Sequence, residues 1–136
     1  MTKILLISLV ILALILGVFY WSQVARASIG NLNIYEGTAD VTRGKETITG
    51  KTGSGIRKSD IVKVGPGSRV SIILKDGSTI TLEAESEVEI VGVTYLRLIK
   101  GKMWSKVEPI PDDVNWQVET PTAVASVRGT EFNTSY

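Results

Sequence analysis

The stretch that decides the fold reads Arg69-Val70-Ser71-Ile72-Ile73-Leu74-Lys75-Asp76-Gly77-Ser78-Thr79-Ile80-Thr81-Leu82. Apolar and β-branched residues recur along both halves of this stretch, and the Lys-Asp-Gly-Ser segment between them has the composition of a tight turn. Two such runs joined by a short glycine-containing turn are typical of a β-hairpin. The sequence therefore predicts an antiparallel strand pair near the centre of the chain.

The turn length of this hairpin follows from its apolar pattern. Directly opposed residues of a strand pair point to the same face of the sheet, so Ile72 should oppose Ile80. By the same reasoning Val70 should oppose Leu82. A two-residue loop breaks this match, whereas a three-residue loop that ends with Gly77 in the left-handed region restores it. We therefore expect a type I turn with a glycine bulge.

Short β-rich runs separated by glycine, aspartate, serine and proline continue outward from this hairpin on both sides. Many short strands with turn residues between them indicate an all-β fold, either a compact β-sandwich of jelly-roll-like type or a short β-solenoid. The predicted strands are 32–35, 38–42, 46–49, 61–64, 69–74, 79–82, 87–91, 95–99, 102–107, 115–119, 123–127 and 130–134.

The N-terminal segment has a different character. From Ile4 to Trp21 every residue except Ser8 is apolar or aromatic, and no charge occurs between Lys3 and Arg26. A helix rises about 1.5 Å per residue, so this run is long enough to cross a hydrocarbon layer of about 30 Å. The sequence predicts one N-terminal transmembrane helix.

A cleaved signal peptide is the alternative for this segment, because Ala25-Arg26-Ala27 has the small-x-small pattern of a cleavage site. The apolar run exceeds the usual signal length of about 7–15 residues, which favours an anchor. We therefore expect residues 1–27 to be an anchor or signal segment and residues 28–136 to be the β domain. Because positive residues favour the cytoplasmic side, Lys3 predicts a single-pass membrane protein whose bulk lies outside the cytoplasm.

The composition excludes several functions. The 136 residues include no cysteine and no histidine, and the net charge is +1. Disulfides, thiolate metal sites and nucleophiles activated by histidine are therefore impossible. A nearly balanced charge gives no electrostatic attraction to nucleic acid. We expect a protein that is not an enzyme, with no catalytic residues, no cofactor, no bound metal and no nucleic-acid partner.

Four glutamates, Glu83, Glu85, Glu87 and Glu89, occupy every second position of one run. One interpretation is a row of carboxylate ligands for calcium. Along an extended strand, however, such neighbours lie about 6.6–6.8 Å apart, too far to converge on one ion without loop oxygens. We therefore predict the solvent face of an edge strand, charged to discourage association.

The aromatic residues of the β region allow two interpretations. Trp104 and Trp116, with Tyr95, are suited to stacking on a sugar or a peptide. Large aromatics more often fill the core or its margin in small β domains. We therefore predict core positions for these side chains.

Several motifs after residue 54 follow one another in a fixed order, and together they resemble the FecR domain. The motifs are Gly55-Ile56, Ser59-Asp60-Ile61, Gly67-Ser68-Arg69-Val70, Asp76-Gly77-Ser78, the alternating 82–90 run, Leu98-Ile99-Lys100-Gly101-Lys102-Met103-Trp104, Glu119-Thr120-Pro121 and Val127-Arg128-Gly129-Thr130-Glu131-Phe132. The resemblance implies an extracytoplasmic β domain of the bacterial cell membrane, periplasmic or extracellular, with a role in signalling or binding. It implies no enzyme activity.

The resemblance also selects candidate site residues, with either a structural or a partner-binding role. Asp60, which the resembled domain usually has after glycine rather than Ser59, should cap turn amides. Phe132 should be buried, and Arg128 should pair with Glu131 or Glu119. The candidates are Asp60, Gly67, Arg69, Asp76, Gly77, Ser78, Arg128, Gly129, Thr130, Glu131 and Phe132, with Ile4 and Trp21 bounding the membrane anchor.

The resemblance implies perception of a signal through contact with another envelope protein. The best-known members add a cytoplasmic segment that controls an extracytoplasmic-function sigma factor. Met1-Thr2-Lys3 is too short for such a segment, so a binding or scaffold role is expected here. The family commonly continues past its last motif, whereas this sequence ends at Tyr136, so a truncated domain is one interpretation. The alternatives are an envelope module that binds or cleaves glycans and a structural domain that self-associates through an open sheet edge.

Overall fold

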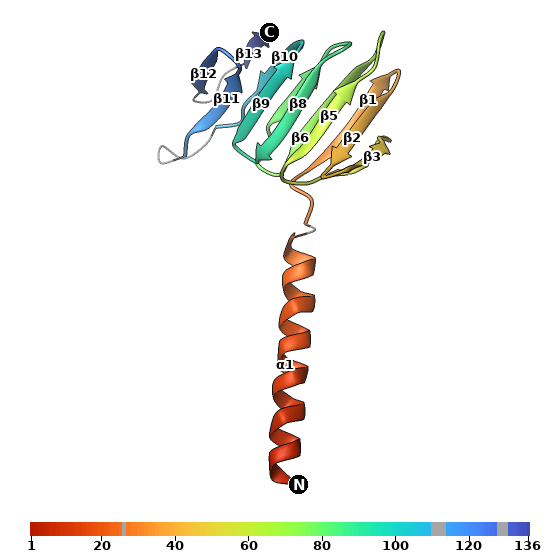
Figure 1. Cartoon of the computed structure of the whole chain (residues 1–136). Helices are drawn as coiled ribbons and strands as arrows, with labels where there is room; N and C mark the ends of the chain where they lie inside the picture. Colours follow the sequence, from red (N-terminus) through yellow and green to blue (C-terminus); the bar gives the residue numbers. More distant parts are fainter. Residues whose placement is uncertain (26, 110–113, 128–130) are drawn as a thin grey trace.

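The computed structural model describes residues 1–25, 27–109, 114–127 and 131–136, which form one long helix and two β-sheets (Figure 1). The helix α1 comprises Thr2–Ala25. The strands are β1 (Gly30–Glu36), β2 (Ala39–Arg43), β3 (Glu46–Thr49), β4 (Gly55–Ile56), β5 (Asp60–Val64), β6 (Arg69–Leu74), β7 (Thr79–Leu82), β8 (Glu87–Gly92), β9 (Tyr95–Lys100), β10 (Lys102–Lys106), β11 (Trp116–Thr120), β12 (Ala123–Val127) and β13 (Glu131–Ser135).

The two sheets form a sandwich, which confirms the prediction of an all-β fold. Sheet A has the strand order β13-β10-β7-β6-β1-β4, and sheet B has the order β12-β11-β9-β8-β5-β2-β3. Neighbouring strands run antiparallel except β9 and β11, which pair in parallel. The chain passes repeatedly from one sheet to the other, so each sheet contains strands from all parts of the β region.

The central hairpin has the predicted register. In β6 and β7, Val70 opposes Leu82 and Ile72 opposes Ile80. The Gly77 amide donates to the Leu74 carbonyl at 3.0 Å, and Gly77 has a φ of 88°. The loop therefore has three residues and a glycine in the left-handed region, as its apolar pattern required.

The core lies between the two sheets and is formed by alternate residues of their strands. Sheet A contributes side chains such as Leu32 and Ile80, and sheet B contributes Val62, Leu96 and Trp116, all of which are buried. Burying one large aliphatic side chain contributes about 1.5–3 kcal/mol. This alternation explains why β-strand periodicity in the sequence located the strands within two residues at either end. Only β4, with two residues, was missed.

The prediction of one acidic edge strand is wrong. The strand ends at Leu82, and the chain turns before β8, with Glu85 at a φ of 59°. The buried Ser86 hydroxyl bonds to both backbone groups of Lys102, which fixes this crossing from sheet A to sheet B. β8 lies between β5 and β9, so it is an inner strand rather than an edge.

The helix α1 extends away from the sandwich (Figure 1). Its large apolar side chains are exposed, from 51% at Ile11 to 81% at Trp21. The segment Thr2–Gln23, with 22 residues, is long and apolar enough to cross a membrane, a property that signal sequences share. The structure is therefore compatible with a single-pass membrane protein.

Candidate functional site

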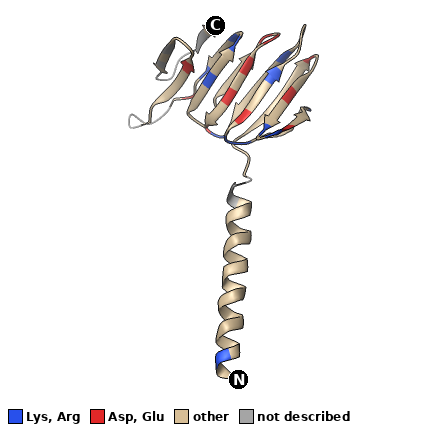
Figure 2. Ribbon diagram, viewed as in Figure 1, with Lys and Arg blue, Asp and Glu red and all other residues tan. Residues whose placement is uncertain are grey.

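Figure 2 shows charges of both signs on adjacent strands of sheet B, and these positions alternate with buried ones, so the charges lie on the outer face of the sheet. The backbone registers place Asp40 of β2 beside Lys63 of β5, and Lys63 beside Glu87 of β8. Opposite charges at directly opposed positions stabilise a strand pair. Glu87 and Glu89 thus face solvent as predicted, among charges that compensate them.

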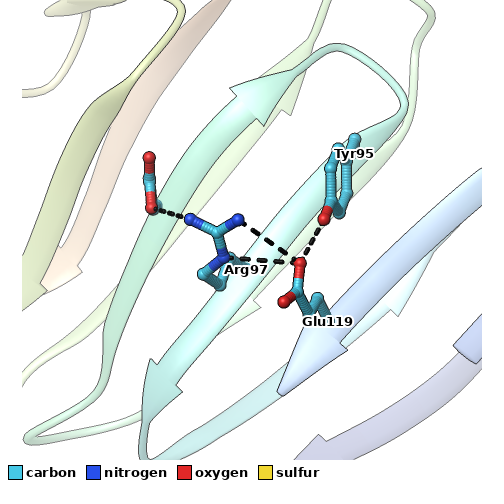
Figure 3. A network of polar contacts seen from close by, with 4 residues as sticks. Tyr95, Arg97 and Glu119 are labelled. Atoms are coloured by element: carbon cyan, nitrogen blue, oxygen red, sulfur yellow. Dashed lines mark hydrogen bonds and ion pairs between the residues drawn. The ribbon is translucent and has the colours of Figure 1, made fainter. Parts of the chain in front are cut away.

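A network of four side chains occupies this face where β8, β9 and β11 meet (Figure 3). Arg97 Nη1 lies 2.8 Å from Glu89 Oε2, and its Nε and Nη2 each lie 3.4 Å from Glu119 Oε2. The Tyr95 hydroxyl donates to the same Glu119 oxygen. Arg97 therefore connects the strands on both sides of β9, including its parallel partner β11.

The network shifts the pKa of three of its members, and hydrogen bonding to Tyr95 and Glu89 raises that of Arg97. The hydrogen bond to Glu119 raises the pKa of the Tyr95 phenol above its usual 10.0. The same hydrogen bond, followed by the charge of Arg97, lowers the pKa of the Glu119 carboxyl below 4.5. Both shifts favour a proton on Tyr95 and a negative charge on Glu119 near neutral pH.

These shifts predict how the network depends on pH. A lowered carboxyl pKa contributes stability above the unfolded value near 4.5, and this stability is lost as the pH falls through the folded value. A raised phenol pKa contributes stability below the unfolded value near 10.0, and this stability is lost as the pH rises through the folded value. Glu119→Gln should therefore lower the urea midpoint most at pH 7 and less at pH 3 and pH 11. A midpoint difference that does not vary with pH would contradict this role.

Asp60 is the one described carboxylate that is buried in the fold. Its side chain is 1% exposed, and Arg43 of β2 binds it through Nε–Oδ1 at 2.9 Å and Nη2–Oδ2 at 2.7 Å. The Arg57 amide donates to Oδ2 at 2.8 Å, which confirms the predicted turn cap. The hydrogen bond to Asp60 raises the pKa of Arg43. No sequence motif pointed to Arg43, because it is separated from its partner by a hairpin and β4.

Ser59, just before this carboxylate, has a left-handed backbone with a φ of 68°. A residue with a side chain is strained there, and glycine is not. Ser59→Gly should therefore raise the free energy of unfolding, by about 0.5–1 kcal/mol once the added freedom of the unfolded chain is subtracted. Urea denaturation of the two proteins measures this difference. A less stable variant would show that the Ser59 side chain makes a stabilising contact.

The Asp-Gly-Ser motif forms the turn of the central hairpin and bonds it to the segment that follows β10. Asp76 accepts hydrogen bonds at 2.9 Å from both the amide and the hydroxyl of Ser78. The Ser78 hydroxyl in turn accepts one from the Glu108 amide at 3.2 Å. These contacts indicate a structural role for Asp76 and Ser78 at the turn.

The other candidate residues are dispersed. Gly67 has a φ of 64° in the turn before β6, and Arg69 is exposed at the start of that strand. Arg128, Gly129 and Thr130 lie outside the described residues. In β13 the backbone of Phe132 pairs with Ser105 of β10. The structure does not describe the side chain of Phe132, so its predicted burial stays a prediction. The predicted ion pair of Arg128 with Glu131 or Glu119 stays one for the same reason.

The aromatic residues separate into two groups. Trp116 is fully buried, which confirms its predicted core position. Tyr95 is partly buried on the outer face of sheet B, where it bonds to Glu119, so the predicted core position is wrong for it. Trp104 is 49% exposed on the outer face of sheet A, so the prediction is wrong for this residue. The reason is the alternation in β10, where Met103 and Ser105 face the core instead.

The comparisons with known proteins agree with this architecture. The family model described as FecR protein matches residues 60–136, which is more than half of the chain. No curated protein and no solved structure matches the chain. The matched region begins at Asp60 of the buried ion pair and includes the Asp-Gly-Ser turn. The chain therefore belongs to the FecR protein family.

Proposed function

We propose that this chain is a membrane-anchored extracytoplasmic domain that perceives a signal or binds a protein partner in the cell envelope, without catalysis. The observation that carries the proposal is an exposed apolar helix that leads directly into the sandwich of the FecR family. The family suggests an envelope signalling regulator, and the helix suggests attachment to the membrane.

The exposure of α1 supports the anchor. A helix of 24 residues is about 36 Å long at 1.5 Å per residue, which exceeds a hydrocarbon layer of about 30 Å. Apolar surface in water is unfavourable by about 25 cal/mol per Å². Leu, Ile and Val side chains occupy all sides of the helix and contact nothing in the sandwich, so lipid is the environment that suits them.

Orientation determines which end of the sandwich meets a partner. Lys3 favours a cytoplasmic N-terminus, which places the sandwich on the opposite side. β1 starts at Gly30, close to the end of the helix, and Tyr136 lies at the end of the sandwich away from the helix (Figure 1). Gly101 lies at that distal end, since Gly101 and Tyr136 exchange two backbone hydrogen bonds. Glu36 ends β1, which starts beside the helix at Gly30, so it lies at the end of this strand away from the helix.

The charged residues of the domain support binding rather than catalysis. Asp60 is held by Arg43 and the Arg57 amide, and Glu119 by Tyr95 and Arg97. A general acid or base needs a pKa near the working pH and access to its substrate. The lowered pKa of Glu119 and the burial of Asp60 suit neither role.

Retention of the helix is the first expected outcome. The protein should remain in the membrane fraction after carbonate extraction with its N-terminal residues intact, because the apolar segment is long enough to span. Mass spectrometry of the purified protein measures this. A mature N-terminus at Ser28 would show that the segment is a cleaved signal peptide.

Partner binding is tested by photo-crosslinking of the full chain in cells. A crosslinkable residue in place of the exposed Tyr35, the next-to-last residue of β1, should give a discrete adduct with another envelope protein. The same residue in place of Lys45, in the β2–β3 turn, is the matched control on the other end of the sandwich. The proposal fails if no distal position yields an adduct that exceeds the control.

A further inference from the structure

The outer face of sheet A differs from that of sheet B in its chemistry. Its β6, β7 and β10 strands contain no aspartate or glutamate. Trp104 opposes Thr81, which opposes Ser71, and Ser71 opposes Asn33 of β1. This row of an indole, two hydroxyls and an amide crosses four strands of the sheet.

The row keeps unused hydrogen-bonding capacity. The Ser71 hydroxyl is buried and has no hydrogen-bond partner among the described residues, whereas the polar groups of sheet B bond to one another. Buried polar groups are normally satisfied. The Ser71 side chain is 0% exposed, so a ligand on this face would contact Trp104 and the partly exposed Thr79 and Thr81 instead.

A hollow of about 310 Å³ lies at the Trp104 end of the row, lined by Thr79, Thr81, Trp104, Ser105 and Lys106. This volume is at the lower limit of small-ligand sites, which span about 300–1,000 Å³. The size of the hollow therefore favours a ring-sized ligand.

We infer that this hollow is a subsite for a pyranose ring of gluco configuration in a β-linked glycan. Such a ring has equatorial hydroxyls and presents axial C–H groups on a flat apolar face, which complements an exposed indole. Threonine hydroxyls both donate and accept hydrogen bonds, as sugar hydroxyls do. Thr79 and Thr81 both lie on β7, next to the strand of Trp104, so the polar contacts line one side of the stacking surface. This inference goes beyond the proposed protein–protein role and does not depend on it.

Tryptophan fluorescence provides a direct test on the full chain in lipid nanodiscs. A Trp21→Phe background removes the tryptophan at the end of the anchor, and Trp116 is fully buried, so acrylamide in solution should quench mainly Trp104. Chitohexaose and cellohexaose, which both consist of β-linked gluco rings, should shield Trp104 from acrylamide. A maltohexaose arm, with α-linked rings, should shield it less.

Variants separate the subsite from general adhesion, with binding to immobilised chitohexaose and cellohexaose as the readout. Trp104→Ala should weaken binding about tenfold or more, the equivalent of about 1.4 kcal/mol, and Trp104→Phe should restore part of it. Thr81→Val should weaken binding while leaving the stacking surface in place. Val124→Ala, at an exposed apolar position on sheet B, is the control and should have no effect.

Two results would overturn the inference. One is the absence of shielding by both β-linked hexasaccharides, and the other is unchanged binding in Trp104→Ala. If Trp104→Ala proves unstable in urea, the Thr81→Val and Trp104→Phe variants decide the question. Crosslinks at Tyr35 that persist in these variants would show that the protein-binding role stands apart from this subsite.

Discussion

Gly101→Val should lower the free energy of unfolding by about 3–5 kcal/mol. Gly101 connects β9 of sheet B to β10 of sheet A and has a φ of 95°. A Cβ atom there would lie 2.6 Å from the Cα atom of Ser86 and closer still to its hydroxyl oxygen. Ser86 is itself held by both backbone groups of Lys102, so it has little room to move.

Gly44→Val is the matched control for this experiment. Gly44 has a φ of 62°, but a Cβ atom there meets nothing within 4 Å. Its loss should be about 1–3 kcal/mol from backbone strain alone. Urea denaturation of both variants, followed by far-UV circular dichroism, isolates the steric contribution at Gly101. Equal losses would mean that Ser86 moves away at little cost.

The sequence predicted those parts of the fold that local patterns determine. The β6–β7 register follows from the alternation around Val70 and Ile80 together with the turn chemistry of Gly77, all within one short stretch. The exposed helix follows from the uninterrupted apolar run after Lys3. The Asp60 turn cap was predictable for the same reason, because its amide partner, Arg57, is three residues away.

Contacts between distant segments were not predictable in this way. Arg43 binds Asp60 because β2 pairs with β5, and Tyr95 meets Glu119 because β9 pairs in parallel with β11. The alternation of Trp104 with Met103 predicts two faces for β10, but it does not state which face is the core. Met103 packs against the facing sheet, so its side of β10 is the core face, and Trp104 points to the outer face.

Arg43→Met should lower the free energy of unfolding by about 2–4 kcal/mol. The substitution keeps an apolar stem of similar length and removes the partner of a carboxylate that is 1% exposed. Breaking a buried ion pair typically costs about 3–5 kcal/mol, because the remaining charge has lost its compensation. The Arg43 side chain is 28% exposed, so water replaces part of the lost interaction and the expected range is lower.

A double-mutant cycle tests this explanation. Asp60→Asn removes the charge but keeps an oxygen that can accept the Arg57 hydrogen bond. If the unpaired charge causes the loss, adding Asp60→Asn to Arg43→Met should recover part of the stability, so that the double variant is more stable than Arg43→Met alone. Urea denaturation at pH 7 measures all four proteins of the cycle. Additive losses would show that Arg43 stabilises the β2–β5 corner through packing and its 3.2 Å hydrogen bond to the Gly55 carbonyl rather than through charge.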